Sequence, residues 1–94
     1  MKERPLNLWD DRKNQANKSK HSIDFETATR LWDDPYRIEI QTSFAEEDRI
    51  ILIGKIDKTL WAVIFTLRDN AYRIISVRRA RKQEAMLYEK SKIS

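Results

Sequence analysis

Residues 50–79 read IILIGKIDKTLWAVIFTLRDNAYRIISVRR and contain three strand-like segments separated by two turns. The first two segments, residues 50–53 and 60–65, are continuous apolar runs rich in β-branched and aromatic side chains. Such runs are typical of central strands that are covered on both faces. Residues 55–59 are short enough to join them as a hairpin, and Arg-Asp-Asn-Ala at 68–71 indicates a second hairpin turn. We therefore expect an antiparallel sheet at the centre of the fold.

The segment after the second turn, residues 72–78, alternates between two faces. Regular alternation predicts that Arg73, Ile75 and Val77 share one face, and that Tyr72, Ile74, Ser76 and Arg78 share the other. Residues 36–41 also alternate apolar and polar side chains, which predicts a half-exposed strand. Residues 42–48 are interpreted as a polar loop that contains Phe44.

The N-terminal part of the chain predicts a short strand and a polar helix. Residues 6–9 alternate leucine with polar residues, as a strand does. Asp10 or Asp11 offers an N-cap for a helix over residues 12–20, in which Ala16 is the only apolar residue. This helix cannot be held in place by an apolar stripe of its own.

A second helix is predicted to begin at Asp24, a plausible N-cap, and to end at Asp33-Asp34-Pro35, because the residue before a proline disfavours the helical conformation. Four apolar side chains recur in it at helical spacing: Phe25, Ala28, Leu31 and Trp32. A final helix is predicted over residues 79–90, with Ala80 and Leu87 as its apolar anchors.

These segments give the element order β-α-α-β-β-β-β-α and the fold class α+β, an antiparallel sheet with two N-terminal helices and one C-terminal helix. The sequence shows no internal repeat, low-complexity tract or linker. We therefore expect residues 1–94 to form one domain.

Composition excludes several classes of protein. The chain has no cysteine, which excludes disulfides and thiolate metal sites and fits a reducing cytoplasm. The longest apolar run, residues 60–67, is far shorter than the roughly 20 residues that a membrane helix needs. The first residues are charged and no hydrophobic stretch follows them, so we expect no signal peptide. We expect a cytoplasmic protein with no membrane contact.

Charge is distributed unevenly along the chain. Residues 71–94 hold seven Lys or Arg against two Glu, a net charge of +5, whereas all earlier residues together sum to −1. A basic end joined to an acidic remainder favours a polyanion bound at one place. Charge alone leaves open the alternative that basic surface residues only keep a small protein soluble.

The inventory of reactive side chains is small. His21 is the only histidine and Gly54 the only glycine, so a two-histidine ribonuclease mechanism, an ordinary zinc site and a glycine-rich phosphate loop are excluded. Carboxylates at residues 33–34 or 46–48 could hold Mg²⁺, although helix-stop and loop roles are the commoner explanation. The remaining candidates lie near one helix end and in the last strand and helix: Lys20, His21, Arg73, Ser76, Arg78, Arg79, Glu84 and Tyr88.

Such groups would suffice for metal-free RNA cleavage. A base takes the 2′-hydroxyl proton, cations hold the phosphate, and an acid protonates the leaving 5′-oxygen. The same residues also have plainer explanations, with Arg78 and Arg79 as a solvated strand end, Glu84 as an intrahelical partner and His21 as a surface or cap residue.

The spacing of these residues resembles the BrnT toxins. The N-terminal signature of that family is matched by Trp9-Asp10, Lys13, Asn17, Lys20-His21, Phe25, Ala28 and Asp34-Pro35, its middle by Glu47, Arg49 and Gly54, and its C-terminal signature by Arg73-Ile74-Ile75-Ser76, Arg78, Ala80, Glu84 and Tyr88. The similarity covers about residues 6–89. Asp11 stands where proline is usual, Ser22 where glycine is usual and Val77 where alanine is usual, so Ser22 could alter the turn after His21.

The resemblance implies a metal-independent ribonuclease toxin of a type II toxin–antitoxin pair, with a RelE-like fold and no cofactor. It also implies that RNA binds on one face of the sheet and that its cleavage arrests translation. The implied partner is a BrnA-like antitoxin with a ribbon-helix-helix DNA-binding module, which covers the active surface and connects the toxin to operator DNA. Trp61 and nearby apolar residues are expected to be partly exposed for that partner.

From the resemblance and the candidate residues together, we expect the catalytic residues to be Lys20, His21, Arg73, Arg78, Glu84 and Tyr88. We expect further RNA contacts from Arg49, Arg68, Ser76, Arg79, Arg81 and Lys82, and no metal ligands. The alternative hypothesis is a non-catalytic basic module that binds nucleic acid or a protein partner.

Overall fold

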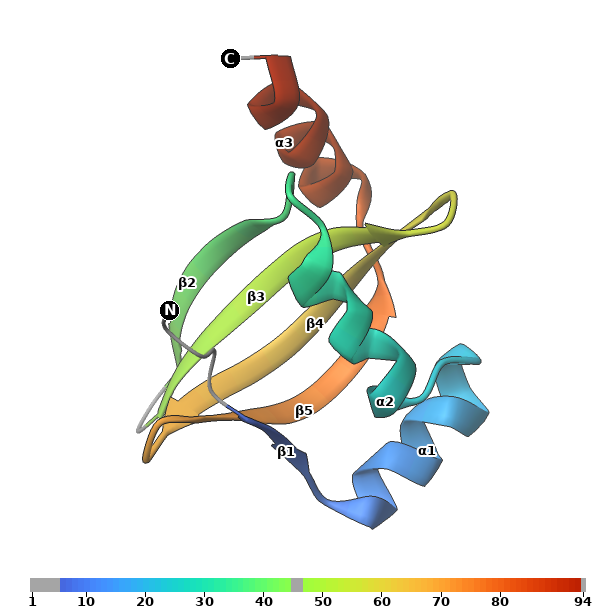
Figure 1. Cartoon of the computed structure of the whole chain (residues 1–94), viewed down its shortest axis with the longest axis vertical. Coiled ribbons are helices and arrows are strands. Elements are labelled where there is room, and N and C mark those ends of the chain that lie inside the picture. Colours follow the sequence, from blue (N-terminus) through green and yellow to red (C-terminus); the bar gives the residue numbers. More distant parts are fainter. Residues whose placement is uncertain (1–5, 45–46, 94) are drawn as a thin grey trace.

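A computed structural model of the chain describes residues 6–44 and 47–93 (Figure 1). Its elements are β1 (Leu6–Trp9), α1 (Asp11–His21), α2 (Phe25–Ala28), the 3₁₀ helix η1 (Thr29–Asp33), β2 (Ile38–Phe44), β3 (Glu47–Ile56), β4 (Thr59–Arg68), β5 (Ala71–Arg79) and α3 (Lys82–Ile93). The α+β class is confirmed. The predicted order holds, except that the second helix is one α-helical turn continued by η1. None of the described helices is long and apolar enough to cross a membrane.

The strands form one sheet in the order β1-β5-β4-β3-β2. The two predicted hairpins, β3–β4 and β4–β5, are confirmed, and β2 also pairs antiparallel to β3. β1 instead pairs parallel to β5, from Leu6 opposite Ala71 to Trp9 opposite Ile74. The sheet is therefore mixed, and the expectation of a purely antiparallel sheet is wrong at this edge. An alternating sequence indicates a strand but not whether it pairs in the parallel or the antiparallel direction. Here the helices that follow β1 connect it to β2 at the opposite edge of the sheet (Figure 1).

The two hairpin turns have the backbone conformation that tight turns need. Asp69 and Asn70 have φ angles of 53° and 61°, which is the left-handed pair of a type I′ turn between β4 and β5. Between β3 and β4, Asp57 has φ 57° and Ile56 already pairs with Thr59. This turn is tighter than the five-residue connection expected from the sequence.

The segment predicted as a polar loop, residues 42–48, is mostly strand. β2 runs to Phe44 and β3 begins at Glu47, with Thr42 opposite Arg49. The Thr42 hydroxyl donates to the Arg49 carbonyl at 2.9 Å. Backbone hydrogen bonds continue the β2–β3 pairing into this polar segment. The polar side chains therefore led to the wrong prediction of a loop. Glu46, one of the carboxylates considered for Mg²⁺, lies outside the described residues.

One face of the sheet, here called the covered face, lies under α2 and η1 (Figure 1). Phe25, Ala28, Leu31 and Trp32 are all buried, which confirms the predicted apolar helix face. They pack with Leu52, Val63, Phe65, Ile74 and Val77 from the strands. The Trp32 ring stacks on Tyr72 with centroids 5.2 Å apart and meets Phe65 edge-on at 5.1 Å.

Gly54 sets how closely η1 approaches the sheet. A Cβ at this position would lie 3.1 Å from Leu31 Cδ2 and 3.3 Å from the Leu31 carbonyl oxygen. A larger residue would push η1 away from β3, so glycine is required here by close packing and not by backbone conformation.

A β-bulge in β5 changes which side chains share a face. Ile64 of β4 pairs with Ser76, and the next residue, Phe65, pairs with Ile74, so Ile75 is an extra residue. Ile74 and Val77 consequently both point into the core of the covered face. The alternation predicted for residues 72–78 is therefore wrong beyond Ile74.

The bulge brings Arg73 and Arg78 to the same side of the sheet. Arg73 is opposite Thr66 and Arg78 is opposite Ala62, and these two β4 residues share a face by regular alternation. We call this the open face, because in the part of the chain that the structure describes only α3 packs on it. Its apolar residues are Ile38, Ile40, Ile51, Ile53, Leu60, Ala62 and Ile64.

α3 attaches to one end of the open face (Figure 1). Tyr88 is its buried anchor, 1% exposed and packed with Ile53 and Ala62, while Ala80 packs beside them. The predicted second anchor, Leu87, is 49% exposed, so that prediction is wrong. The helix begins at Lys82 and not at residue 79, and this shift rotates a different set of side chains toward the sheet.

Candidate functional site

α1 is held at the free edge of β5 by asparagine side chains. β1 pairs only with residues 71–74, and beyond them the Val77 N–H donates to Asn17 Oδ1 at 2.9 Å. Asn17 Nδ2 donates to the Ile23 carbonyl at 3.0 Å, and Asn14 Oδ1 accepts from the Phe25 N–H at 2.8 Å. Asn17 is buried at 6% exposure. These amides replace the apolar stripe that the sequence of α1 lacks.

The Asn17 contact places Lys20 and His21 beside β5. They follow Asn17 by three and four residues, so they lie on the same side of α1. They line two adjoining hollows of about 390 Å³ and 330 Å³. Trp61 and Arg79 border the first, and Ile75 and Ser76 border the second.

The turn after His21 is shaped by Ser22. Asp10 accepts from the backbone N–H of Arg12 at 2.8 Å and caps the start of α1, as predicted. At the other end Ser22 is left-handed, with φ 63°, and its N–H donates to the Lys18 carbonyl. This conformation explains why glycine would be favoured at this position, and serine adopts it here without displacing His21 from the hollows.

Trp61 and Arg79 form one wall of the first hollow. They are opposite each other on β4 and β5, and the Arg79 guanidinium lies 5.8 Å from the centroid of the Trp61 ring. Trp61 is half-buried, which confirms its expected partial exposure.

Arg78 points to the open face and forms a forked ion pair with Glu84. Its two terminal nitrogens donate to Glu84 Oε1 and Oε2 at 2.7 and 2.9 Å. Glu84 Oε1 also accepts from the Arg81 N–H at 2.7 Å at the start of α3. The hydrogen bonds from Arg78 lower the pKa of Glu84 despite its burial. A carboxylate held in this way positions Arg78 and is a poor proton acceptor.

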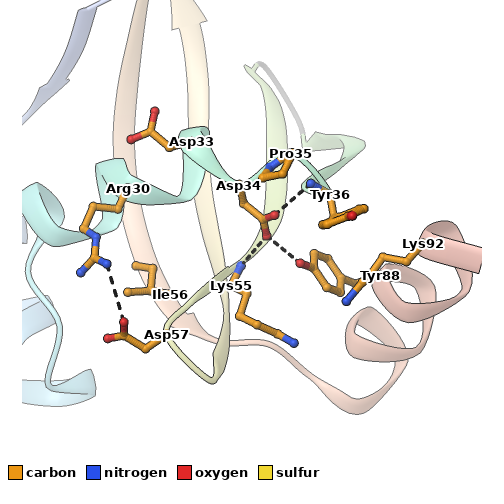
Figure 2. Close-up of a pocket in the computed structure, with 10 residues that line it drawn as sticks. All are labelled: Arg30, Asp33, Asp34, Pro35, Tyr36, Lys55, Ile56, Asp57, Tyr88 and Lys92. Atoms are coloured by element: carbon orange, nitrogen blue, oxygen red, sulfur yellow. Dashed lines mark hydrogen bonds and ion pairs between the residues drawn. The ribbon is translucent and has the colours of Figure 1, made fainter.

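Tyr88 belongs to a different cluster, shown in Figure 2. Its hydroxyl donates to Asp34 Oδ2 at 2.7 Å, and Asp34 also accepts from the backbone N–H groups of Tyr36 and Lys55, both at 2.9 Å. Burial, followed by the contact with Asp34, raises the pKa of Tyr88. Burial alone would raise the pKa of Asp34, but the hydrogen bond from Tyr88 and the two N–H groups outweigh it and lower that pKa. This geometry serves to dock α3 and does not favour proton transfer by Tyr88.

Four of the predicted RNA-contacting or catalytic arginines share the open face. Arg68 and Thr66 are two residues apart on β4 and therefore share a face. Arg73 of β5 is opposite Thr66, so it lies on that face as well. Arg49 of β3 is opposite Thr42, two residues before Ile51, which packs on the same face. Arg78 completes the set near α3. Ser76, opposite Ile64, lies between Arg73 and Arg78.

The structure thus divides the predicted site residues into groups. Lys20, His21, Ser76 and Arg79 meet at the β5 edge, while Arg73 and Arg78 occupy the adjoining open face. Arg81 and Lys82 are exposed, just before and at the start of α3, and Arg68 lies at the end of β4, opposite the first residue of β5. Glu84 and Tyr88 bind partners of their own. Within residues 6–44 and 47–93, no group of three or more His, Asp or Glu side chains could hold a metal ion.

The sequence did not reveal the role of Asn17. The available signal was an asparagine one turn before Lys20 and His21, in a helix without an apolar stripe. Its hydrogen bond to Val77 spans 60 residues in sequence and depends on where β1 ends, which only the three-dimensional structure defines.

Most of the chain matches a known protein family. Residues 9–84 match the model of the ribonuclease toxin BrnT of type II toxin–antitoxin systems. No curated protein shows a significant match to this chain. Since the family model covers most of the sequence, the chain belongs to the BrnT family of ribonuclease toxins.

Proposed function

We infer, with membership of the BrnT family as the premise, that this chain is a metal-independent endoribonuclease that cleaves RNA by attack of the 2′-hydroxyl and so inhibits translation. Family membership supports the ribonuclease activity. The observation that carries the proposed site is the β5 bulge, because it sets Arg73 and Arg78 on one face beside the edge where Lys20 and His21 lie.

Arg78 is the proposed principal phosphate ligand. Glu84 occupies one N–H of each terminal nitrogen, which fixes the guanidinium plane. The Nε–H and the second N–H of Nη2 then remain as candidates to contact a phosphate oxygen. A guanidinium fixed in advance loses little freedom on binding, so it can stabilise the charge that develops on the phosphate. Arg73 extends this cationic surface along the open face.

His21 is the proposed proton-transfer group. Histidine exchanges protons near neutral pH, and this residue lines both hollows at the β5 edge. Lys20 and Arg79 lie beside it and supply supporting positive charge. In this proposal Glu84 positions Arg78, and Tyr88 anchors α3 without taking part in the chemistry.

The experiment that tests this function is cleavage of single-stranded RNA by the purified chain in excess EDTA. We expect products with 2′,3′-cyclic phosphate ends, and no cleavage of an RNA that carries a 2′-deoxy substitution at the cut, because the nucleophile is then missing. Cleavage of the deoxy substrate at an unchanged rate would refute 2′-hydroxyl attack. Loss of activity in EDTA with recovery on adding Mg²⁺ would refute metal independence.

The proposed partner is an antitoxin, as in type II systems generally. We propose that it is BrnA-like, that it reaches operator DNA through a ribbon-helix-helix module, and that the pair acts in the cytoplasm. Co-expression with the product of the adjacent small gene should relieve growth arrest and give a stable complex. Separate elution of the two proteins at micromolar concentration would contradict this pairing.

A further inference from the structure

The outward side of α3 carries an exposed apolar surface. Met86 is 62% exposed, Leu87 49% and Ile93 87%, whereas Glu84 and Tyr88 on the inward side are buried. With Lys82, Ala85 and Lys90 these three residues line a shallow apolar groove. We call this surface the α3 groove. Exposed apolar side chains gathered on one surface mark an interaction site more often than scattered ones do.

The charges around the α3 groove are mainly positive. Arg81, Lys82, Lys90 and Lys92 belong to α3 or to the residue just before it, and all are exposed. The one acidic residue that lines the groove, Glu89, lies 3.9 Å from both Lys55 Nζ and Lys92 Nζ. Glu84 is engaged by Arg78 on the inward side. A segment that fills the groove therefore meets an apolar floor with a cationic rim.

Two other occupants fit this surface poorly. A second copy of the chain would bring the same lysines together, and like charges across an interface are unfavourable. A helix of 12 residues is only about 18 Å long, so a pair of α3 helices alone would fall short of the roughly 1,200 Å² that stable interfaces bury. RNA would leave Met86, Leu87 and Ile93 without apolar partners, because RNA is recognised through phosphates, hydroxyls and base faces.

We propose that the α3 groove binds an acidic amphipathic helix of the antitoxin. The apolar face of such a helix would cover Met86, Leu87 and Ile93, and its carboxylates would meet Lys82 and Lys90. The groove forms part of a larger antitoxin interface. This inference rests on the antitoxin partner of the proposed function and is independent of RNA cleavage.

The test measures affinity between the purified chain and the product of the adjacent antitoxin gene by titration calorimetry. The double substitution Met86→Glu with Leu87→Glu should weaken binding at least about tenfold, since it puts carboxylates where the proposed helix is acidic and apolar. The matched control is Leu67→Glu, because Leu67 is an equally exposed leucine, at 54%, in the strand end near the β4–β5 turn. The control should bind within twofold of the original chain.

Three outcomes would overturn the proposal. Unchanged affinity of the double variant would place the antitoxin elsewhere, and equal weakening by Leu67→Glu would remove the specificity for α3. A chain that elutes alone as a dimer and becomes monomeric in the double variant would assign the groove to a second copy. Circular dichroism and RNA cleavage by both variants, which change only exposed residues outside the proposed site, separate these outcomes from misfolding and from failure of the ribonuclease proposal.

Discussion

α1 and α3 both attach to β5, but different chemistry holds each of them. α1 is fixed by neutral amides, with Asn17 bonded to Val77 and Asn14 bonded to Phe25. α3 is fixed by charged or strongly polarised groups, through Arg78 with Glu84 and Tyr88 with Asp34. The amide contacts do not titrate, so these hydrogen bonds of α1 do not depend on pH. The contacts of α3 titrate, and one of them uses an arginine that we also propose to bind phosphate.

The largest expected effect comes from Arg78, which holds α3 through Glu84 and is also the proposed phosphate ligand. Arg78→Ala should lower RNA cleavage by at least about 10²-fold, because it removes a fixed donor at the phosphate. Arg78→Lys keeps the charge without the planar fork and should recover only part of the activity. Initial rates on a single-stranded RNA would measure both. Cleavage by the alanine variant within threefold of the original would remove Arg78 from the site.

The role of the amide contacts of α1 is tested by comparing the variants Asn17→Ala and Asn14→Ala. Asn14→Ala loses one hydrogen bond and Asn17→Ala loses two, and we expect each substitution to lower the free energy of unfolding by about 1–3 kcal/mol, with the larger loss for Asn17→Ala. Only Asn17→Ala frees α1 from β5, so its kcat should fall at least about tenfold at a temperature where both variants are folded, with a smaller change in KM. Equal kcat values for the two variants would show that Asn17 is purely structural.

The carboxylates that hold α3, Glu84 and Asp34, predict that the free energy of unfolding falls in acid. The folded-state pKa of both Glu84 and Asp34 is lowered, so the unfolded chain takes up protons first as the pH falls. Their contribution to the free energy of unfolding is complete above their ordinary pKa values and declines below about pH 5. Urea unfolding at several pH values should show this decline, and Glu84→Gln should reduce its size while lowering stability at pH 7 by about 1–3 kcal/mol. A Glu84→Gln profile parallel to that of the original chain would contradict the argument.

The smallest effect is expected for Tyr88→Phe. The ring still fills its place between Ile53 and Ala62, and Asp34 keeps two backbone donors, so the loss should be about 1 kcal/mol. Because burial and Asp34 raise the pKa of Tyr88, its stabilising contribution is complete below the ordinary value of 10.0 and is lost as the pH rises above it. The variant should lack this alkaline component. RNA cleavage should be unchanged, and a large loss would return Tyr88 to the catalytic candidates.

The sequence predicted those features that depend on local periodicity. The buried face of Phe25, Ala28, Leu31 and Trp32 follows from helical spacing, and the hairpin at residues 68–71 follows from turn chemistry, although its turn type was not predicted. The parallel pairing of β1 could not be predicted, because a strand of alternating residues pairs in either direction.

The wrong predictions for α3 and β5 also arose because the orientation of each element depends on how it packs or pairs with another element. Leu87 and Tyr88 differ by one position, and which of them faces the sheet depends on where the helix begins. The extra residue Ile75 is defined only by its pairing with β4. The candidate site was therefore predicted as a set of residue types, whereas the division into a β5 edge, an open face and a separate Tyr88 cluster required the coordinates.

The bulge at Ile75 acts as a change of phase within a single strand. If β5 were straightened so that Ile75 paired with Ile64, every later residue would shift by one position, which would turn Val77 to the open face and Arg78 to the covered face. Such a strand would keep both arginines but would place Arg73 and Arg78 on opposite faces of the sheet. The pairing of β5 with β4 is thus as much a determinant of this toxin as the identity of its arginines.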